Sequence, residues 1–138
     1  MEIDKKNIKI DGSNLKIAIV VPYFNESLTL ELLKNAKTEL LANKVKEKNI
    51  EIVRVAGSLE IPFACQKISQ RKKVDAIIAL GVIIKGETSH YDLVSRNCYE
   101  GLMQVQLKTG IPIACGVLAC ENLKQAKIRI SKKGLNKG

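Results

Sequence analysis

Histidine, tryptophan and aromatic residues in general are scarce in this sequence, and each scarcity argues against a class of protein. Aromatic residues make up 4% of the chain, which offers little surface for stacking the bases of a single-stranded nucleic acid. There is one histidine, and none of the four cysteines belongs to a CxxC pair. Because structural zinc sites need several such ligands at short spacings, we expect no metal site.

The sequence also lacks the run of roughly 18 apolar residues that a membrane-spanning helix needs, so no membrane partner is expected. Its first residues, MEIDKKNIKIDGSNLK, are too polar for a secretory signal. All four cysteines lie within apolar segments, and we expect them to be buried, reduced thiols that act as small hydrophobic side chains: Cys65, Cys98, Cys115 and Cys120. These features together predict a cytoplasmic protein.

Positive charge is present in excess. Lysine and arginine outnumber aspartate and glutamate by 23 to 14, which gives a formal net charge of +9. A basic α/β domain that binds nucleic acid is therefore one alternative that the composition leaves open. The cations are scattered along the chain, however, and a surface that attracts small anionic molecules fits equally well.

Short apolar runs alternate with segments of helical periodicity along the chain. Four runs rich in β-branched residues predict strands at 15–23, 50–56, 74–84 and 111–119. Helices are predicted at 27–44, 61–71 and 92–108, with a last one that begins near Glu121. A further short strand is expected near Ile8–Ile10, before the turn at Asp11–Gly12.

The spacing of apolar residues predicts the buried side of each helix. In chain order, the residues expected to point inward are Leu30, Leu33, Ala36 and Leu40, then Ile61, Ala64, Cys65 and Ile68, then Val94, Cys98, Leu102 and Val105, and finally Leu123, Ala126 and Ile130. Asn25 or Ser27 is expected to cap the first helix. Gly110 and Pro112 are expected to end the third helix.

Strands that are apolar throughout are typical of a parallel sheet covered on both faces. With right-handed crossovers, we expect a single domain over residues 1–138, whose first 14 residues form an N-terminal arm. The predicted fold is a three-layer α/β/α sandwich of flavodoxin-like type with four parallel strands. Ligands of such sheets bind beyond the carboxyl ends of the strands. Four segments should therefore meet in one cleft: 22–27, 56–62, 81–90 and 115–122.

Two of these segments carry side chains suited to a ring and to hydroxyl groups. Phe24, at the exit of the first strand, can stack on a planar ring or can close the core as a hydrophobic plug. Glu60, after Gly57 and Ser58, can accept hydrogen bonds from hydroxyls or can cap the helix that follows. The residues alone do not decide between these alternatives.

The segment GETSHYD, residues 86–92, contains the single histidine. Gly86 permits a sharp turn, and no GKS or GKT follows it, so this is not a Walker loop. Backbone amides near Glu87 and Thr88, with the Thr88 hydroxyl, can hold an oxyanion or a phosphate. His90 can exchange protons at neutral pH, although a lone histidine is often only structural. The residues thus indicate a small-molecule site and name no substrate.

Five segments occur in a characteristic order: YFNE, AGSLEIP, DAIIALGVIIKGETSHYDLV, TGIPIACGVL and LNKG. From about residue 15 onward they resemble the 6,7-dimethyl-8-ribityllumazine synthase family, whose patterns include G-x-T-x-H-[FY]-D and PGxxE[IL]P. That family is a group of transferases in the penultimate step of riboflavin biosynthesis. They condense 5-amino-6-(D-ribitylamino)uracil with 3,4-dihydroxy-2-butanone 4-phosphate. The resemblance implies the same activity here, with no cofactor or metal.

The resemblance also implies roles for individual residues. The positions expected at the pyrimidine and its ribityl chain are Phe24, Asn25, Ser58, Leu59 and Glu60, together with the backbones of Val82, Ile83 and Ile84. Glu87 and Thr88 would lie at the phosphate of the four-carbon substrate, with Arg129 and Lys137 as further substrate-binding positions. His90 would donate and accept the protons. Without the family, Arg129 reads as an ordinary solvated cation of a lysine-rich helix.

Two positions suggest a site shared between subunits. Cys115 takes a place that is usually phenylalanine in the family, and it would reach the site, like Arg129, from a neighbouring copy. The resemblance therefore implies a homo-oligomer, either a pentamer, a decamer or a 60-mer of pentamers, with riboflavin synthase as a candidate partner. Leu59 and Ala56 also replace a common phenylalanine and proline. The family continues past LNKG with another helix, which has no counterpart in these 138 residues.

Two other interpretations stay open at this point. A relative that binds a flavin or a pterin without catalysis would keep Phe24 and would not need His90. A purely structural protein that forms shells would need neither residue. Formation of the lumazine from the two substrates separates both interpretations from the enzyme.

Overall fold

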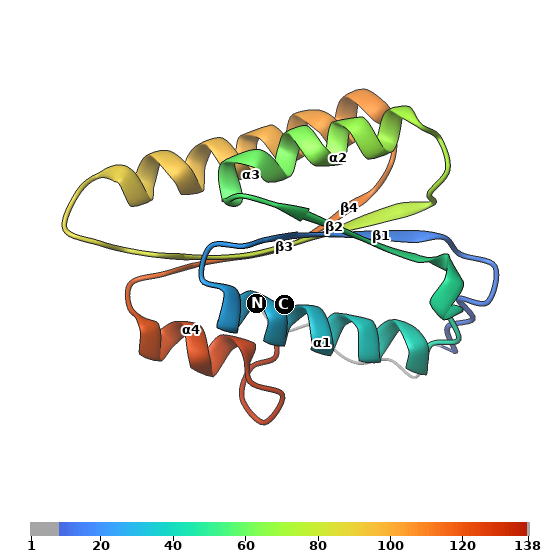
Figure 1. The fold of residues 1–138 in the computed structure, drawn as a ribbon, viewed down its shortest axis with the longest axis horizontal. Coiled ribbons are helices and arrows are strands. Elements are labelled where there is room, and N and C mark those ends of the chain that lie inside the picture. The colour runs from blue at the N-terminus through green and yellow to red at the C-terminus, as the bar shows by residue number, and fades with distance from the viewer. Residues whose placement is uncertain (1–8, 138) are drawn as a thin grey trace.

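The computed structural model describes residues 9–137, which form one four-stranded parallel sheet in the order β2-β1-β3-β4. The strands are β1 (Ile17–Pro22), β2 (Ile50–Val55), β3 (Ala76–Ile84) and β4 (Ile113–Cys120). The helices are α1 (Glu26–Ala42), α2 (Ile61–Gln70), α3 (His90–Thr109) and α4 (Leu123–Ile130), with short 3-10 turns η1 (Glu47–Asn49) and η2 (Ser58–Glu60). Figure 1 shows α2 and α3 on one face and α1 and α4 on the other, which confirms the predicted three layers.

Both faces of the sheet are packed with apolar side chains. Ile61, Cys98 and Leu102 belong to the cluster under α2 and α3. Leu32 and Ile130 belong to the cluster under α1 and α4. Since both faces are covered, every residue of β1 is buried, and its sequence IAIVVP is apolar throughout instead of alternating.

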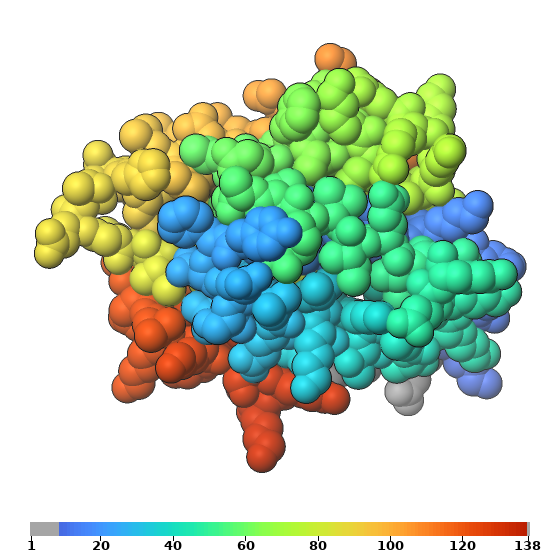
Figure 2. Space-filling model, in the orientation of Figure 1, coloured from blue at the N-terminus to red at the C-terminus, as the bar shows by residue number. Residues whose placement is uncertain are grey.

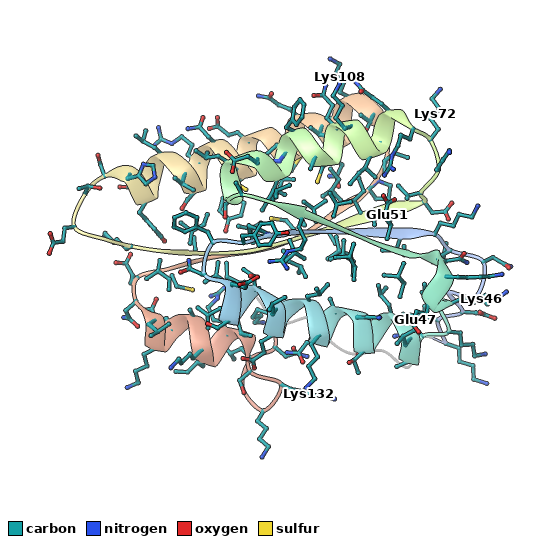
Figure 3. The ribbon with its side chains drawn as sticks, viewed as in Figure 1. Lys46, Glu47, Glu51, Lys72, Lys108 and Lys132 are labelled. Carbon is teal, nitrogen blue, oxygen red and sulfur yellow. The ribbon has the colours of Figure 1, made fainter. Side chains whose placement is uncertain are left out.

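The positive charge stays outside these layers. Figure 3 shows the side chains of Lys72, Lys108 and Lys132 pointing away from the body of the molecule.

None of the helices between residues 9 and 137 has the length and hydropathy needed to cross a bilayer.

The buried side of α1 differs from the prediction. Leu30 is 42% exposed, and the residues that the helix buries are Leu28, Thr29, Leu32 and Ala36. Leucines lie on two overlapping stripes of this helix, so their spacing does not choose between them. Thr29 can join the buried stripe because its hydroxyl donates to the carbonyl oxygen of Pro22 at 3.1 Å.

Other boundaries shift by a few residues. α3 begins at His90, so the histidine is the first residue of the helix and does not precede it. Leu123, expected to point inward, is the first residue of α4 and is 48% exposed, because only the later turns of α4 cover the sheet. The strand expected near Ile8–Ile10 begins outside the described residues, and Lys9 and Ile10 belong to no helix or strand.

β1 and β3 separate toward their carboxyl ends. Their pairing stops at Val20 and Ala79, whereas β3 continues to pair with β4 as far as Ile84 and Cys120. The chain leaves β1 toward α1 on one face of the sheet and leaves β3 toward α3 on the other (Figure 1). Such a reversal of winding direction opens a crevice in parallel sheets, here between β1 and β3.

The contact between α2 and α3 has no room for a side chain at Gly101. A Cβ there would lie 2.8 Å from the Cβ and Cγ atoms of Pro62, whose ring is held in the first turn of α2. We predict that Gly101→Ala lowers the free energy of unfolding by about 1–3 kcal/mol, measured by urea denaturation. Gly86→Ala is the matched control, because a Cβ there meets nothing within 4 Å. Equal stability of Gly101→Ala and wild type would contradict this packing.

Candidate active site

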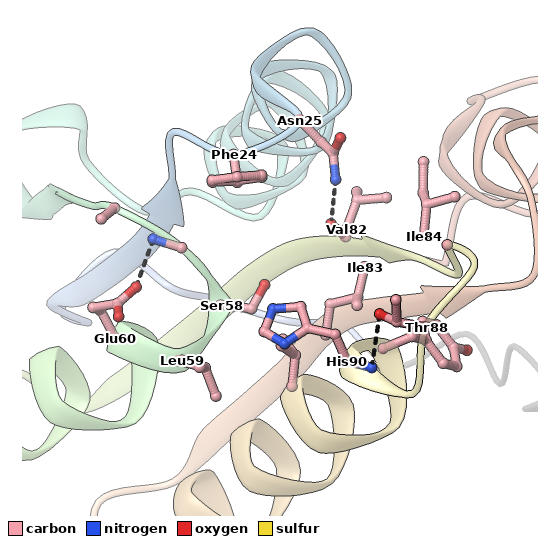
Figure 4. A pocket seen from close by; sticks show the side chains of 15 residues that line it. Phe24, Asn25, Ser58, Leu59, Glu60, Val82, Ile83, Ile84, Thr88 and His90 are labelled. Carbon is pink, nitrogen blue, oxygen red and sulfur yellow. Dashed lines mark hydrogen bonds between the residues drawn. The ribbon is translucent and has the colours of Figure 1, made fainter.

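A cavity of about 530 Å³ occupies the crevice between β1 and β3. Figure 2 shows the segments around it, coloured blue, green and yellow, side by side at one end of the molecule. Ten residues singled out in the sequence line the cavity: Phe24, Asn25, Ser58, Leu59, Glu60, Val82, Ile83, Ile84, Thr88 and His90 (Figure 4). Segments 22–27, 56–62 and 81–90 therefore meet as predicted.

Four other predicted residues do not line the cavity of this single chain: Glu87, Cys115, Arg129 and Lys137. The expectation that all four strand ends share one cleft is wrong for β4. This strand lies at the edge of the sheet beyond β3, and it leads into α4 on the opposite face from α3. Cys115 is near the amino end of β4, where it pairs with Ala79. Its thiol is exposed on this edge strand, so the expectation of four buried thiols is wrong for Cys115. Arg129 and Lys137 are adjacent, since the Lys137 amide donates to the Arg129 carbonyl oxygen at 2.7 Å.

Asn25 connects the two strands where they separate. Its φ of 55° is in the left-handed region, which asparagine tolerates better than most residues. Its side-chain Nδ2 donates to the carbonyl oxygen of Val82 at 2.8 Å (Figure 4). Asn25 is the N-cap residue of α1, as predicted, but its side chain makes no capping hydrogen bond because it is directed to β3. It thereby fixes the width of the crevice.

Phe24 forms one wall of the cavity. Its side chain is 73% exposed, so the alternative of a hydrophobic plug is wrong. The Phe24 amide donates to the Ala56 carbonyl oxygen at 3.2 Å, which joins the end of β1 to the end of β2. The aromatic face is therefore available to a planar ligand.

Glu60 has one oxygen engaged and one available. Its Oε2 accepts a hydrogen bond from the Gly57 amide at 2.7 Å, which is the capping role considered in the sequence. No hydrogen bond within residues 9–137 engages Oε1. Ser58 is buried beside it, and a Cβ at Gly81 would lie 3.2 Å from the Ser58 Oγ. A glycine in β3 thus leaves room for this serine beneath the cavity.

Backbone groups of β3 face the crevice. The Lys85 amide donates to the Cys120 carbonyl oxygen, so odd-numbered residues of β3 are directed toward β4. Val82 and Ile84 alternate with them and are directed toward β1. Both lie past the last β1–β3 pair, and Asn25 takes the Val82 carbonyl. The amides of Val82 and Ile84, with the Ile84 carbonyl, thus lie on the side of β3 that faces the crevice.

His90 opens α3 and faces the cavity. Its amide donates to the Thr88 Oγ1 at 3.3 Å, and Figure 4 shows its ring directed into the cavity. The first turn of a helix favours anions, because its amides lack partners within the helix. An imidazole and a threonine hydroxyl lie together at this end of the site, beside the start of α3.

Beyond these ten, the cavity is lined by Ala56, Gly57 and Gly86 of the same segments, and by Tyr91 and Val94, which the sequence interpretation did not assign to the site. Val94 follows His90 by four residues, so helical spacing from the histidine would have found it. Burial raises the pKa of Tyr91, which keeps its phenol protonated at neutral pH. Within residues 9–137, no group of three or more His, Cys, Asp or Glu side chains is placed to hold a metal ion.

Comparison with known proteins identifies the family. The family model described as 6,7-dimethyl-8-ribityllumazine synthase matches residues 14–138. Three curated relatives carry that name. The protein of Leuconostoc mesenteroides subsp. mesenteroides is 43% identical over 94% of this chain and 83% of its own. That of Paracidovorax citrulli is 47% identical over 91% and 82%, and that of Pediococcus pentosaceus is 45% identical over 93% and 82%. This chain belongs to the 6,7-dimethyl-8-ribityllumazine synthase family.

Proposed function

We propose that this chain condenses 5-amino-6-(D-ribitylamino)uracil with 3,4-dihydroxy-2-butanone 4-phosphate to give 6,7-dimethyl-8-ribityllumazine, phosphate and water. Membership of the family supports the reaction. The structural observation that carries it is the convergence of four groups on one cavity. They are an exposed aromatic face, a free strand edge, a carboxylate oxygen, and a helix start with an imidazole.

The uracil and its ribityl chain fit the side of the cavity formed by β1, β2 and β3. A uracil edge alternates hydrogen-bond donors and acceptors, as do the backbone groups of Val82 and Ile84. Phe24 would stack on the ring, and its exposure leaves the face free for this contact. Glu60 Oε1 would accept from ribityl hydroxyls while Oε2 holds the Gly57 amide.

The phosphate of the second substrate fits the start of α3. Amides near Glu87 and Thr88 and the Thr88 hydroxyl offer donors to an anion. Arg129 would add charge from a neighbouring copy. Its planar guanidinium suits a phosphate, which it can bind through two parallel N–H groups.

His90 would move protons between the two reactants. Imine formation expels one water from the carbonyl carbon. Elimination then removes a proton from carbon and releases phosphate, and ring closure of the second nitrogen onto the remaining carbonyl expels a second water. Each step moves a proton to or from carbon, nitrogen or oxygen, and one imidazole can serve as the acid and the base in turn. Holding amine and carbonyl side by side supplies much of the remaining rate.

We predict that His90→Ala lowers kcat by about 10²–10⁴-fold, because general acid–base catalysis is lost. Lumazine formation in a steady-state absorbance assay measures the effect. The circular dichroism spectrum and the assembly mass should match wild type, since no hydrogen bond within residues 9–137 engages the imidazole. Unchanged kcat would remove His90 from the mechanism. Wild-type protein that makes no lumazine, yet binds the uracil, would favour the non-catalytic interpretation.

We further propose that the chain works as a homo-oligomer. The outer face of α2 and α3 exposes large apolar side chains, among them Phe63 at 64%, Met103 at 54% and Leu107 at 76%. A groove between these helices is lined by residues of both, including Phe63 and Val105. Soluble monomers rarely expose an apolar surface of this kind. A second copy of the chain is the partner that would also bring Arg129 to the site.

We predict that native mass spectrometry finds a multiple of the 15.2 kDa chain, such as a pentamer, a decamer or a 60-mer. Phe63→Lys should shift the population toward monomer, because it places a charge in the apolar face. Lys46→Glu changes charge at an exposed side chain between α1 and β2, away from this apolar face, and serves as control (Figure 3). A monomer at every concentration would contradict the shared site.

A chemical test addresses the place of Cys115, the one exposed cysteine of the four. Burial raises the pKa of Cys65 and of Cys98 to about 12, so at pH 7 both remain protonated as well as shielded. A maleimide should therefore modify Cys115. We predict that the modification lowers turnover roughly tenfold or more, because the adduct would fill a neighbour's cavity. Cys115→Ser should resist the reagent. Full modification with undiminished turnover would contradict this placement.

We also infer a cytoplasmic location. All four thiols are free, and one of them is exposed, as is usual in a reducing compartment. Riboflavin synthase is a candidate partner, on the ground of family membership alone.

A further inference from the structure

Arg54 lies in β2, outside the cavity, and makes four contacts with the turn between β1 and α1. Its Nε donates to the Val21 carbonyl oxygen at 3.2 Å, and its Nη2 donates to the Pro22 carbonyl oxygen at 3.4 Å. The same Nη2 donates to Glu26 Oε1 at 3.1 Å. The guanidinium carbon lies 4.0 Å from the centre of the Tyr23 ring. One side chain thus contacts the end of β1 and the start of α1.

These contacts place Tyr23 on a particular face of the sheet. Val53 and Val55 pack under α2 and α3, so Arg54, which alternates with them, is directed to the α1 face. The Tyr23 ring, stacked on Arg54, is held on that side. Phe24, the next residue, lines the cavity instead. Two successive aromatic side chains therefore leave β1 in different directions, and Arg54 contacts only the first.

Phe24 has few contacts of its own that would hold its ring. It is 73% exposed, and its backbone hydrogen bond to Ala56 is long, at 3.2 Å. The Arg54 side chain, by contrast, is only 23% exposed, and shielding strengthens cation–π contacts and charge-assisted hydrogen bonds. The direction of the Phe24 ring thus depends on the neighbouring residue being fixed.

We propose that Arg54 is a positioning residue that determines which aromatic side chain faces the substrate. By holding Tyr23 on the α1 face, it presents Phe24 to the pyrimidine ring. The inference rests on the proposed function for the identity of the ligand. A planar guanidinium suits this task because it can stack on a ring while its N–H groups bind carbonyl oxygens, which lysine cannot do.

The test measures the affinity for 5-amino-6-(D-ribitylamino)uracil by isothermal titration calorimetry, which needs no turnover. Arg54→Ala should raise Kd about three- to tenfold, because the fixed direction of the Phe24 ring is lost. Tyr23→Leu should give a similar rise while it leaves the hydrogen bonds of Arg54 in place. Tyr23→Phe keeps the ring and should bind like wild type. In turnover, kcat and the KM for the butanone phosphate should change by less than about twofold.

A double variant distinguishes positioning from general loosening. In a Phe24→Ala background, Arg54→Ala should cause no further rise in Kd, because its effect passes through the missing ring. Arg71→Ala is the matched control. Arg71 binds Glu51 at 2.9 and 3.0 Å, also against β2 but away from the cavity, and its loss should leave Kd unchanged.

Several outcomes would overturn the proposal. One is that the effects of Arg54→Ala and Phe24→Ala on Kd are additive. Another is that Arg71→Ala raises Kd as much as Arg54→Ala does. A third is that Tyr23→Leu binds the uracil with wild-type affinity. Wild-type protein that binds the uracil but forms no lumazine would contradict the proposed function alone, and the positioning of Phe24 would still be measured by Kd.

Discussion

The separation of β1 from β3 beyond Val20 and Ala79 is the constraint on which the rest of the site depends. Up to that pair, each strand satisfies the other's backbone groups, and beyond it the groups of β3 need other partners. Asn25 provides a partner for one of those that face β1, the Val82 carbonyl, and Val82, Ile83 and Ile84 line the cavity. The topology thus places backbone polar groups of β3, here called the polar strip, along an otherwise apolar sheet, independently of any side chain that binds a ligand.

Polar side chains around this strip divide their hydrogen-bonding capacity between structure and ligand. Glu60 uses Oε2 to hold the Gly57 amide and keeps Oε1 available. Thr88 accepts from the His90 amide with its hydroxyl oxygen, and its hydroxyl hydrogen can still donate. Capping and binding are therefore not alternatives at these positions. A group already fixed by one hydrogen bond loses less conformational entropy when it makes a second.

Much of this arrangement can be predicted from the sequence, because two strong signals agree. Apolar runs located the four strands, and the rule for parallel sheets selected three segments that hold thirteen of the lining residues. Periodicity predicted the wrong burial at two positions. Leu30 is exposed because leucines lie on two overlapping stripes of α1, and Leu123 is exposed because the first turn of α4 does not pack on the sheet. The contacts of Arg54 with Tyr23 join different strands, so no local pattern reveals them. The roles proposed for Cys115 and Arg129 need a second copy of the chain, and the cavity of the single chain includes neither residue.

α3 links two parts of the molecule that are otherwise separate. It is 20 residues long, which corresponds to about 30 Å, with His90 at one end and the exposed Leu107 near the other. A helix is stiff along its axis, so a shift imposed at one end is carried to the other with little loss. A neighbouring chain that packs against the carboxyl end of α3 would therefore also affect the position of the His90 imidazole relative to the reactants. Quaternary packing and proton delivery would then be mechanically coupled through a single element.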